Sequence, residues 1–299
     1  MPVFRTMLFA PGNHPRKVEK SLGLNADAVI LDLEDAVAIA EKPATRTAIV
    51  EALAGDRRCR AYVRVNAFDT PFCYGDLCEV VCPRLDGIVL PKVESAAQLV
   101  AIDWLLTQLE RDRGMAQGAL DLIPIIETGK GVAAMAGIAG AGTRTRRLSF
   151  GGGDYTLDMG MRWTLEEAEL DDARARVVLA SRAAGLEPPV DTVFIHLDQP
   201  EMLARSAERV RDMGFQGKLC IHPSQVGPVN AAFTPTDEAV AKARRYVQAF
   251  EEAEVAGSAS IQVDGFFIDY PIVEQARRTL ELVDALEAGR AKIAKAAPR

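Results

Sequence analysis

The sequence predicts an α/β protein built as a (β/α)₈ TIM barrel, and three observations support this fold class. Eight short apolar runs recur along the first three quarters of the 299 residues. Stretches rich in Ala, Leu, Glu and Arg, typical of helices, separate the runs. Most runs are continuously apolar, as expected of parallel strands buried on both faces. Eight strand–helix units favour a closed barrel, and an open doubly wound sheet is the alternative.

The eight runs define the expected strands in chain order. They are Thr6–Ala10, Ala28–Leu33, Ala61–Asn66, Gly87–Pro91, Leu122–Glu127, Arg147–Gly151, Thr192–His196 and Lys218–His222. The expected helices between them are Arg16–Leu24, Lys42–Leu53, Ala96–Arg111, Lys130–Ala139, Leu165–Ala184 and Gln199–Met213. In a barrel of parallel strands, the carboxyl ends of all strands meet at one mouth, where active sites lie.

A different pattern follows the eighth strand. Thr234-Pro235 predicts a helix start, with a Thr cap and Pro at the first position. Ile261–Ile268 reads as a hairpin that turns at Asp264-Gly265. Pro271 opens a last helix that runs to about Leu286. We therefore expect a barrel domain over 1–233 and a C-terminal helical lid segment over 234–299.

The composition excludes several classes of protein. Hydrophobic residues make up 48% and charged residues 26%, as in ordinary globular proteins. The net charge of −7 argues against nucleic acid as a partner. No apolar run reaches the ~18 residues of a membrane span, and the N-terminus does not resemble a signal peptide. The odd number of cysteines, 5, without a C-x-x-C pair, predicts free thiols in a reducing cytoplasm.

Polar and charged residues stand at the carboxyl ends of the expected strands. Charged groups at the end of an apolar strand are costly unless they form pairs or bind a ligand. Together they make a candidate site at the barrel mouth, formed by Asp32, Glu34, Asp35, Arg64, Asn66, Lys92, Glu127, Asp154, His196 and His222.

Glu127 and Asp154 form the strongest pair in this set. They follow adjacent strands, so both carboxylates are expected at one mouth, and two oxygen ligands with open positions suit Mg²⁺. The alternative is that each carboxylate caps a helix or pairs with an arginine, and the spacing leaves both readings open. Gly151–Gly153 precede Asp154 and would let a substrate approach the backbone.

Arg64 ends a buried strand, where a guanidinium can bind a substrate carboxylate through two hydrogen bonds. The alternative is a salt bridge to Asp32 or Glu34, which share one face of the second strand. These two acids could orient Arg64, and Asp35 could hold a metal-bound water. The histidines form no metal-binding pattern, so we expect them to be hydrogen-bonding residues of loops or core.

Eight motifs occur in one order along nearly the whole chain. Together they resemble the citrate lyase beta-subunit-like branch of the HpcH/HpaI aldolase family. The motifs are Arg5–Gly12, Leu31–Val37, Val63–Asn66, Leu90–Lys92, Ile125–Thr128, Phe150–Tyr155, Ile221–Gln225 and Phe267–Pro271.

The resemblance implies a Mg²⁺-dependent carbon–carbon lyase that cleaves or condenses a 3-hydroxyacyl-CoA such as citryl-, malyl- or citramalyl-CoA. The products would be acetyl-CoA and a 2-oxo acid. By the resemblance, Glu127 and Asp154 hold the metal, and Arg64 binds the oxo acid. Asp269 acts as acid/base from the lid of a neighbouring subunit, which implies a homo-oligomer, a trimer or hexamer. The residues alone favour another reading, in which Asp269 merely precedes a helix start and stabilises its dipole.

The resemblance also implies contacts to coenzyme A. The matching positions are Arg16, Lys20, Lys42 and Phe9. One departure is visible, because many relatives carry Glu directly before the metal Asp, where this chain has Gly153. Two other functions stay open. One is a CoA-independent pyruvate-type aldolase of the same fold, and the other is a subunit that is inactive outside a larger lyase complex.

Overall fold

A computed structural model describes residues 2–296 of the chain, with side chains as far as residue 289. The chain divides into two compact units, and the boundary falls between Phe233 and Thr234. The first unit begins at Phe4 and contains eight parallel strands in a closed barrel, in the order of the sequence. The predicted barrel is therefore confirmed, and the open-sheet alternative is excluded.

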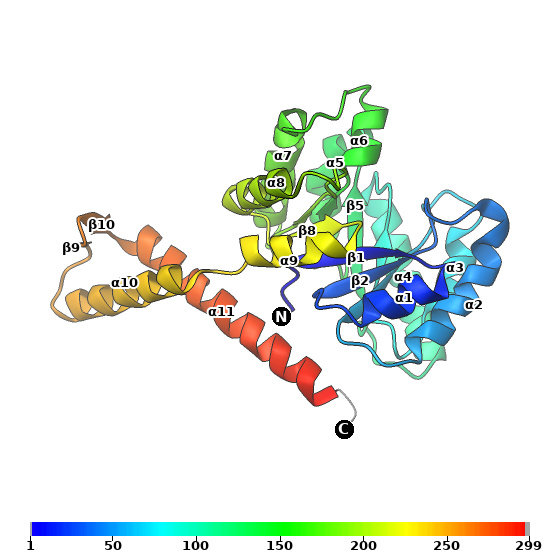
Figure 1. Ribbon diagram of the computed structural model, residues 1–299, viewed down its shortest axis with the longest axis horizontal. Coiled ribbons are helices and arrows are strands. Elements are labelled where there is room, and N and C mark those ends of the chain that lie inside the picture. Colours follow the sequence, from blue (N-terminus) through cyan, green and yellow to red (C-terminus); the bar gives the residue numbers. More distant parts are fainter. Residues whose placement is uncertain (1, 297–299) are drawn as a thin grey trace. The chain divides into compact units, whose positions relative to one another are not determined.

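The strands of the barrel run from blue to yellow-green in Figure 1. They are β1 (Thr6–Pro11), β2 (Ala28–Asp32), β3 (Arg60–Arg64), β4 (Gly87–Leu90), β5 (Asp121–Ile126), β6 (Ser149–Phe150), β7 (Val190–Asp191) and β8 (Gly217–Cys220). The register pairs Asp32 at the end of β2 with Arg64 at the end of β3. The alternation of side chains along each strand separates two cores. Ile30 and Tyr62 belong to a small apolar cluster, whereas Leu31 and Val63 join the large one that includes the helices.

The seventh strand was predicted in the wrong place. The ladder contains Val190 and Asp191 and ends before Thr192. Thr192 Oγ1 instead accepts a hydrogen bond from the Gly152 backbone N–H at 2.7 Å. Phe194 is still buried, so the apolar pattern over 192–196 reports burial rather than strand pairing.

The helices around the barrel match the predicted ones closely, with three additions. The observed helices are α1 (Pro15–Leu22), α2 (Lys42–Leu53), α3 (Cys73–Val80), α4 (Ala96–Asp112), α5 (Gly129–Ala139), α6 (Gly152–Asp158), α7 (Asp171–Ala183), α8 (Pro200–Met213) and α9 (Pro223–Ala232). Single 3₁₀ turns cover Ile39–Glu41 and Ala168–Leu170. The sequence did not indicate α3, α6 or α9. α6 begins with two glycines and α9 contains Pro228, all poor helix formers.

The second unit contains α10 (Asp237–Val255), the hairpin β9 (Ile261–Val263) and β10 (Phe266–Ile268), and α11 (Tyr270–Ala296) (Figure 1). The cap of α10 is Thr236, whose hydroxyl accepts from Ala239 N at 3.2 Å; the expectation of Thr234 was two residues early. Asp264 and Gly265 form the hairpin turn, both with positive φ. α11 extends well past Leu286, where the sequence predicted its end.

The core of the second unit lies between α10 and α11. Ala243, Tyr246 and Phe250 of α10 pack with Ile268 and Val273. Across residues 2–296, none of the helices combines the length and apolar character that a membrane crossing requires. All the cysteines are free thiols, as predicted.

Candidate active site at the barrel mouth

Arg64 is locked to Asp32 at the carboxyl end of the barrel. Its Nε and Nη2 atoms donate to the two Asp32 oxygens, each at 2.7 Å. The Phe9 ring lies against the guanidinium, with its centroid 4.7 Å from Cζ. Burial alone would raise the Asp32 pKa, but Arg64 and two backbone N–H donors outweigh it and hold the pKa below its usual range. The salt-bridge alternative is therefore present, and Asp32 fixes the plane of the guanidinium.

Glu34 bridges two cations. Its Oε1 accepts from Lys92 Nζ at 2.6 Å, and its Oε2 lies 2.9 Å from Arg64 Nη1. Oε2 is buried and, apart from this ion pair, accepts no hydrogen bond from the residues that the structure describes. Asp35 is more exposed and lies within 3.4 Å of Arg64 Nη1 and 3.7 Å of Lys92 Nζ. Burial raises the pKa of Glu34 despite these two cations.

Glu127 is a deeply buried acid of the site. It follows β5, is 3% exposed, and accepts the Lys92 backbone N–H at 2.8 Å through Oε1. A Cβ atom on Gly151 would lie only 2.3 Å from Glu127 Oε2, so glycine at this position makes room for the carboxylate. Burial, and then the neighbouring Glu34 and Asp154 charges, raise the pKa of Glu127 to about 8.

Asp154 completes the cluster from the first turn of α6. Its Oδ1 lies 3.7 Å from Lys92 Nζ, and its charge is one cause of the raised pKa of Glu127. The site therefore gathers five carboxylates, of Asp32, Glu34, Asp35, Glu127 and Asp154, around the two cations Arg64 and Lys92.

The carboxylates fit a divalent cation of the magnesium type. In the part of the chain described here, no group of three or more His, Cys, Asp and Glu side chains forms a complete metal site. Mg²⁺ does not require one, because it is commonly bound by one or two carboxylates together with water and substrate oxygens. Glu127 and Asp154 are such a pair. Burial, and then the neighbouring negative charges, raise the pKa of Glu127, and a bound cation would relieve this excess of negative charge.

Lys92 is a site residue whose role the sequence did not reveal. It follows β4 with φ 51°, the left-handed conformation that non-glycine residues rarely adopt. This conformation lets the backbone N–H reach Glu127 while the side chain reaches Glu34. Burial lowers the pKa of Lys92, but Glu34, Glu127 and Asp154 together raise it above its ordinary value. A charged residue directly after an apolar strand was the one available signal.

The residues expected to contact coenzyme A fall into two groups. Arg16 and Lys20 are exposed and lie one turn apart on α1, which begins close after the carboxyl end of β1. Lys42 is 6% exposed, and its ammonium donates to the Leu33 and Glu34 carbonyls and to Asn66 Oδ1, each at 2.7 Å. The Phe9 ring packs against the Arg64 guanidinium. Lys42 thus holds the loop after β2 in place through these hydrogen bonds.

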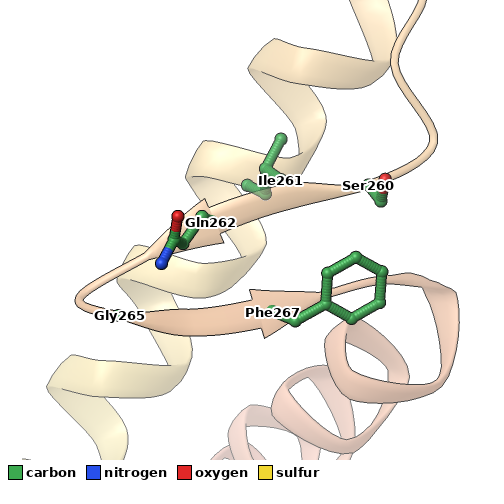
Figure 2. Close-up of a pocket in the computed structure, with 5 residues that line it drawn as sticks. All are labelled: Ser260, Ile261, Gln262, Gly265 and Phe267. Atoms are coloured by element: carbon green, nitrogen blue, oxygen red, sulfur yellow. The ribbon is translucent and has the colours of Figure 1, made fainter.

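Asp269 belongs to the second unit. It directly precedes α11, where its Oδ1 accepts from Ile272 N at 3.4 Å and its carbonyl accepts from Val273 N at 2.9 Å. Asp269 therefore serves as a helix cap within its own unit. A nearby surface pocket on the hairpin is lined by Ser260, Ile261, Gln262, Gly265 and Phe267 (Figure 2). This lining holds no ionisable group and so offers no acid, base or metal ligand.

The histidines lie away from this cluster of contacts. His222 caps α9, because its Nδ1 accepts from Ser224 N at 3.2 Å. His196 packs against Phe194 in an edge-to-face pair. These contacts describe His196 and His222, and it stays a prediction that the histidines are not ligands.

A closed (β/α)₈ barrel with a carboxylate-rich, cation-bridged mouth defines the class: a barrel enzyme whose site suits a divalent cation and an anionic substrate. The particular family follows from comparison with known proteins. Residues 5–223 match the HpcH/HpaI aldolase/citrate lyase family, and the chain belongs to it.

Characterised relatives extend over nearly the whole chain. The citrate lyase subunit beta of Leuconostoc mesenteroides is 36% identical over 283 residues, 94% of this chain and 93% of that protein. The L-malyl-CoA/beta-methylmalyl-CoA lyase of Cereibacter sphaeroides is 37% identical over 306 aligned positions, 94% of this chain and 96% of that protein.

Solved structures show the same similarity. Protein CitE of Mycobacterium tuberculosis, in complex with magnesium, acetoacetate and coenzyme A, matches with a TM-score of 0.76 and 30% identity, over 93% of this chain and 97% of that one. A citrate lyase beta subunit from the same organism, complexed with oxaloacetate and magnesium, matches 78% of this chain and 98% of that one, with a TM-score of 0.64 and 31% identity.

Proposed function

We propose that the protein is a Mg²⁺-dependent carbon–carbon lyase that cleaves or condenses a 3-hydroxyacyl-CoA, with acetyl-CoA and a 2-oxo acid as the other reactants. The observation that carries this proposal is the pairing of Glu127 and Asp154 beside a fixed Arg64 at the mouth of a barrel of this family. The named relatives act on citrate or on malyl-CoA esters, and the similar structures hold magnesium with coenzyme A or an oxo acid.

Glu127 and Asp154 would hold the metal, and no arginine whose side chain the structure describes pairs directly with either carboxylate. When bound, Mg²⁺ polarises the oxygen of the reacting carbonyl or hydroxyl and stabilises the negative charge that develops there. The backbone N–H of Lys92 keeps Glu127 in place through Oε1. Because Glu127 must be deprotonated to act as a ligand, its raised pKa makes metal binding depend on pH.

Arg64 would bind the carboxylate of the 2-oxo acid. Asp32 holds its Nε and Nη2 atoms, so the guanidinium is oriented before the substrate arrives. The Nη1 end already pairs with Glu34 at 2.9 Å and Asp35 at 3.4 Å, so a substrate anion would share this end with them or displace them. A prepositioned guanidinium loses little conformational freedom on binding.

Asp269 would act as the acid/base. In the cleavage direction, the Asp269 carboxylate takes the hydroxyl proton and the O–H electron pair becomes the carbonyl of the 2-oxo acid. The carbon–carbon bond breaks, and its electron pair forms the thioester enolate. Asp269 then gives a proton to the enolate carbon, which yields acetyl-CoA, and in condensation it removes that proton. We propose that Asp269 reaches the site from the 234–299 segment of a neighbouring subunit, which requires a homo-oligomer such as a trimer or hexamer.

Arg16 and Lys20 would attract the phosphates of coenzyme A. Both are exposed, and neither forms an ion pair with any other described residue, so they are free to pair with phosphate. We leave Lys42 out of these contacts, because its ammonium is already bonded to three protein oxygens.

A complementation experiment tests the role in trans. Glu127→Gln and Asp269→Asn should each abolish acetyl-CoA release when purified alone. When the two variants are co-expressed and purified together as mixed oligomers, they should recover part of the wild-type rate. Some sites then combine an intact Glu127 from one subunit with an intact Asp269 from another. Mixtures that stay inactive would show that Asp269 does not serve another subunit.

The second candidate is a subunit that works only within a larger lyase complex. The observation in its favour is that some relatives are named as the beta subunit of citrate lyase. Turnover of acyl-CoA by the isolated chain would exclude this candidate.

A further inference from the structure

The ammonium of Lys92 occupies the centre of the carboxylates at the barrel mouth. It lies 2.6 Å from Glu34 Oε1, 3.7 Å from Asp35 Oδ1 and 3.7 Å from Asp154 Oδ1. Three acids, two from the segment after β2 and one from the first turn of α6, thus converge on one cation. The side chain is only 31% exposed, so solvent screens these attractions less than at the surface.

The backbone of the same residue serves the remaining acid. Lys92 N–H donates to Glu127 Oε1 at 2.8 Å, and this geometry needs the left-handed φ of 51°. A lysine in this conformation costs free energy compared with glycine. The strain is retained at a residue that touches both proposed metal carboxylates, one through its backbone and the other through its ammonium.

We propose that Lys92 is a positioning residue that acts as a tethered counter-cation: it neutralises the carboxylates while the metal is absent and competes with the metal for Asp154. This inference rests on the proposed function, because it takes Glu127 and Asp154 as the metal-binding pair. Lys92 then stabilises the metal-free site and lowers the affinity of the protein for Mg²⁺.

The direction in which Mg²⁺ affinity changes on replacing Lys92 distinguishes a competing cation from a merely structural residue. A residue that only holds the ligands in place would weaken Mg²⁺ binding when removed. A competing cation would do the opposite, because its removal ends both the repulsion of Mg²⁺ and the competition for Asp154. Lys92→Met should therefore tighten Mg²⁺ binding, by about fivefold or more at low ionic strength.

The experiment measures the thermal midpoint of metal-free protein titrated with MgCl₂, without substrate. Lys92→Met should unfold at a lower temperature than the wild type when metal-free, and gain more from Mg²⁺. Lys92→Gly should behave like Lys92→Met, because it too lacks the ammonium. Glycine also relieves the backbone strain, so this variant separates the charge from the strain. Lys92→Arg, which keeps the charge, should return close to the wild type.

Lys130→Met is the matched control. Lys130 stands at the start of α5, after β5 rather than β4; its side chain is 73% exposed and pairs with Glu94. Lys130→Met removes the same charge as Lys92→Met and should leave the apparent Mg²⁺ affinity unchanged within about twofold.

Three outcomes decide the matter. Tighter Mg²⁺ binding in Lys92→Met, but not in Lys130→Met, supports the counter-cation. Equal or weaker binding in Lys92→Met, with a normal response of the wild type, overturns the inference and leaves the proposed lyase intact. If the wild type itself shows no Mg²⁺-dependent shift, the metal of the proposed function is wrong and the inference falls with it.

Discussion

A methyl group on Gly151 would lie 2.3 Å from Glu127 Oε2, well inside contact distance. The last residue before α6 therefore sets where the proposed metal carboxylate of the neighbouring strand can lie. The nearest obstacles around this position are all atoms of Glu127 and Ile125, so a larger residue at 151 must displace the ligand.

Gly151→Ala should lower Mg²⁺ affinity and lyase activity by at least about tenfold, because Glu127 must move away from the position that Lys92 N–H supports. Gly137→Ala is the control. Gly137 lies in α5 with no atom within 4 Å of an added Cβ, and this change should stabilise the protein by about 0.5–1 kcal/mol. Titration calorimetry with Mg²⁺ and a rate assay check both variants. Normal Mg²⁺ affinity in Gly151→Ala would contradict the assigned ligand.

The pKa of Glu127 predicts how stability depends on pH. Its carboxyl has a pKa of about 8 in the folded protein, against 4.5 ordinarily. Between these values the folded state holds a proton that the unfolded state has released. The stability of the metal-free protein should therefore fall as pH rises through this window, by at most about 1.4 kcal/mol per pH unit for this group.

Denaturant unfolding of metal-free protein from pH 5 to pH 8.5 measures this dependence. Glu127→Gln cannot titrate and should flatten the slope, while the Lys92 N–H can still bond to its amide oxygen. Saturating Mg²⁺ should oppose the loss at high pH, because it favours the deprotonated carboxylate. A slope that Glu127→Gln does not change would mean that another group titrates.

Arg64→Lys should destabilise the protein by about 2–3 kcal/mol, because lysine cannot replace the two parallel hydrogen bonds to the buried Asp32. In the condensation direction it should also raise KM for the oxo acid. Arg60→Lys, on the same strand, is the control, since the Arg60 side chain is 42% exposed and its ion pair with Asp86 lies nearer the surface. Equal losses in both variants would argue against a special role for the Arg64–Asp32 pair.

Reversing the charges on α1 should weaken binding of the CoA ester. The double variant Arg16→Glu with Lys20→Glu is expected to raise KM for acyl-CoA by about tenfold or more, with little change in kcat, because both cations would meet phosphate equally in ground and transition states. The double variant Arg182→Glu with Arg205→Glu, at exposed positions on α7 and α8, controls for the same change in net charge. Steady-state kinetics at low and high salt test this, and a KM that responds equally to both variants would exclude a local contact.

The sequence revealed the barrel because the strands are buried on both faces, and burial leaves a continuous apolar run. The same signal misplaced the seventh strand. Phe194 is buried although its segment forms no ladder, so hydrophobicity alone cannot tell a paired strand from a buried loop.

In the candidate site, too, the sequence revealed some residues, whereas the roles of others became clear only from the structure. Glu127, Asp154 and Arg64 were recognisable because charged groups after apolar strands need partners. Lys92 was visible in the same pattern, but its role depends on a left-handed backbone that no local residue pattern announces. Lys42 shows the converse: the family resemblance implied a contact to coenzyme A, and only the fold shows that three protein oxygens already bind its ammonium.

The most direct test of the account is to incubate the purified protein with Mg²⁺ and a panel of 3-hydroxyacyl-CoA esters, and to identify the products by mass spectrometry. We expect acetyl-CoA and one 2-oxo acid in equal amounts, release that stops on chelation of Mg²⁺, and no release by Glu127→Ala or Asp154→Ala. Full activity of either variant, or cleavage of a free hydroxy acid without the thioester, would contradict the account.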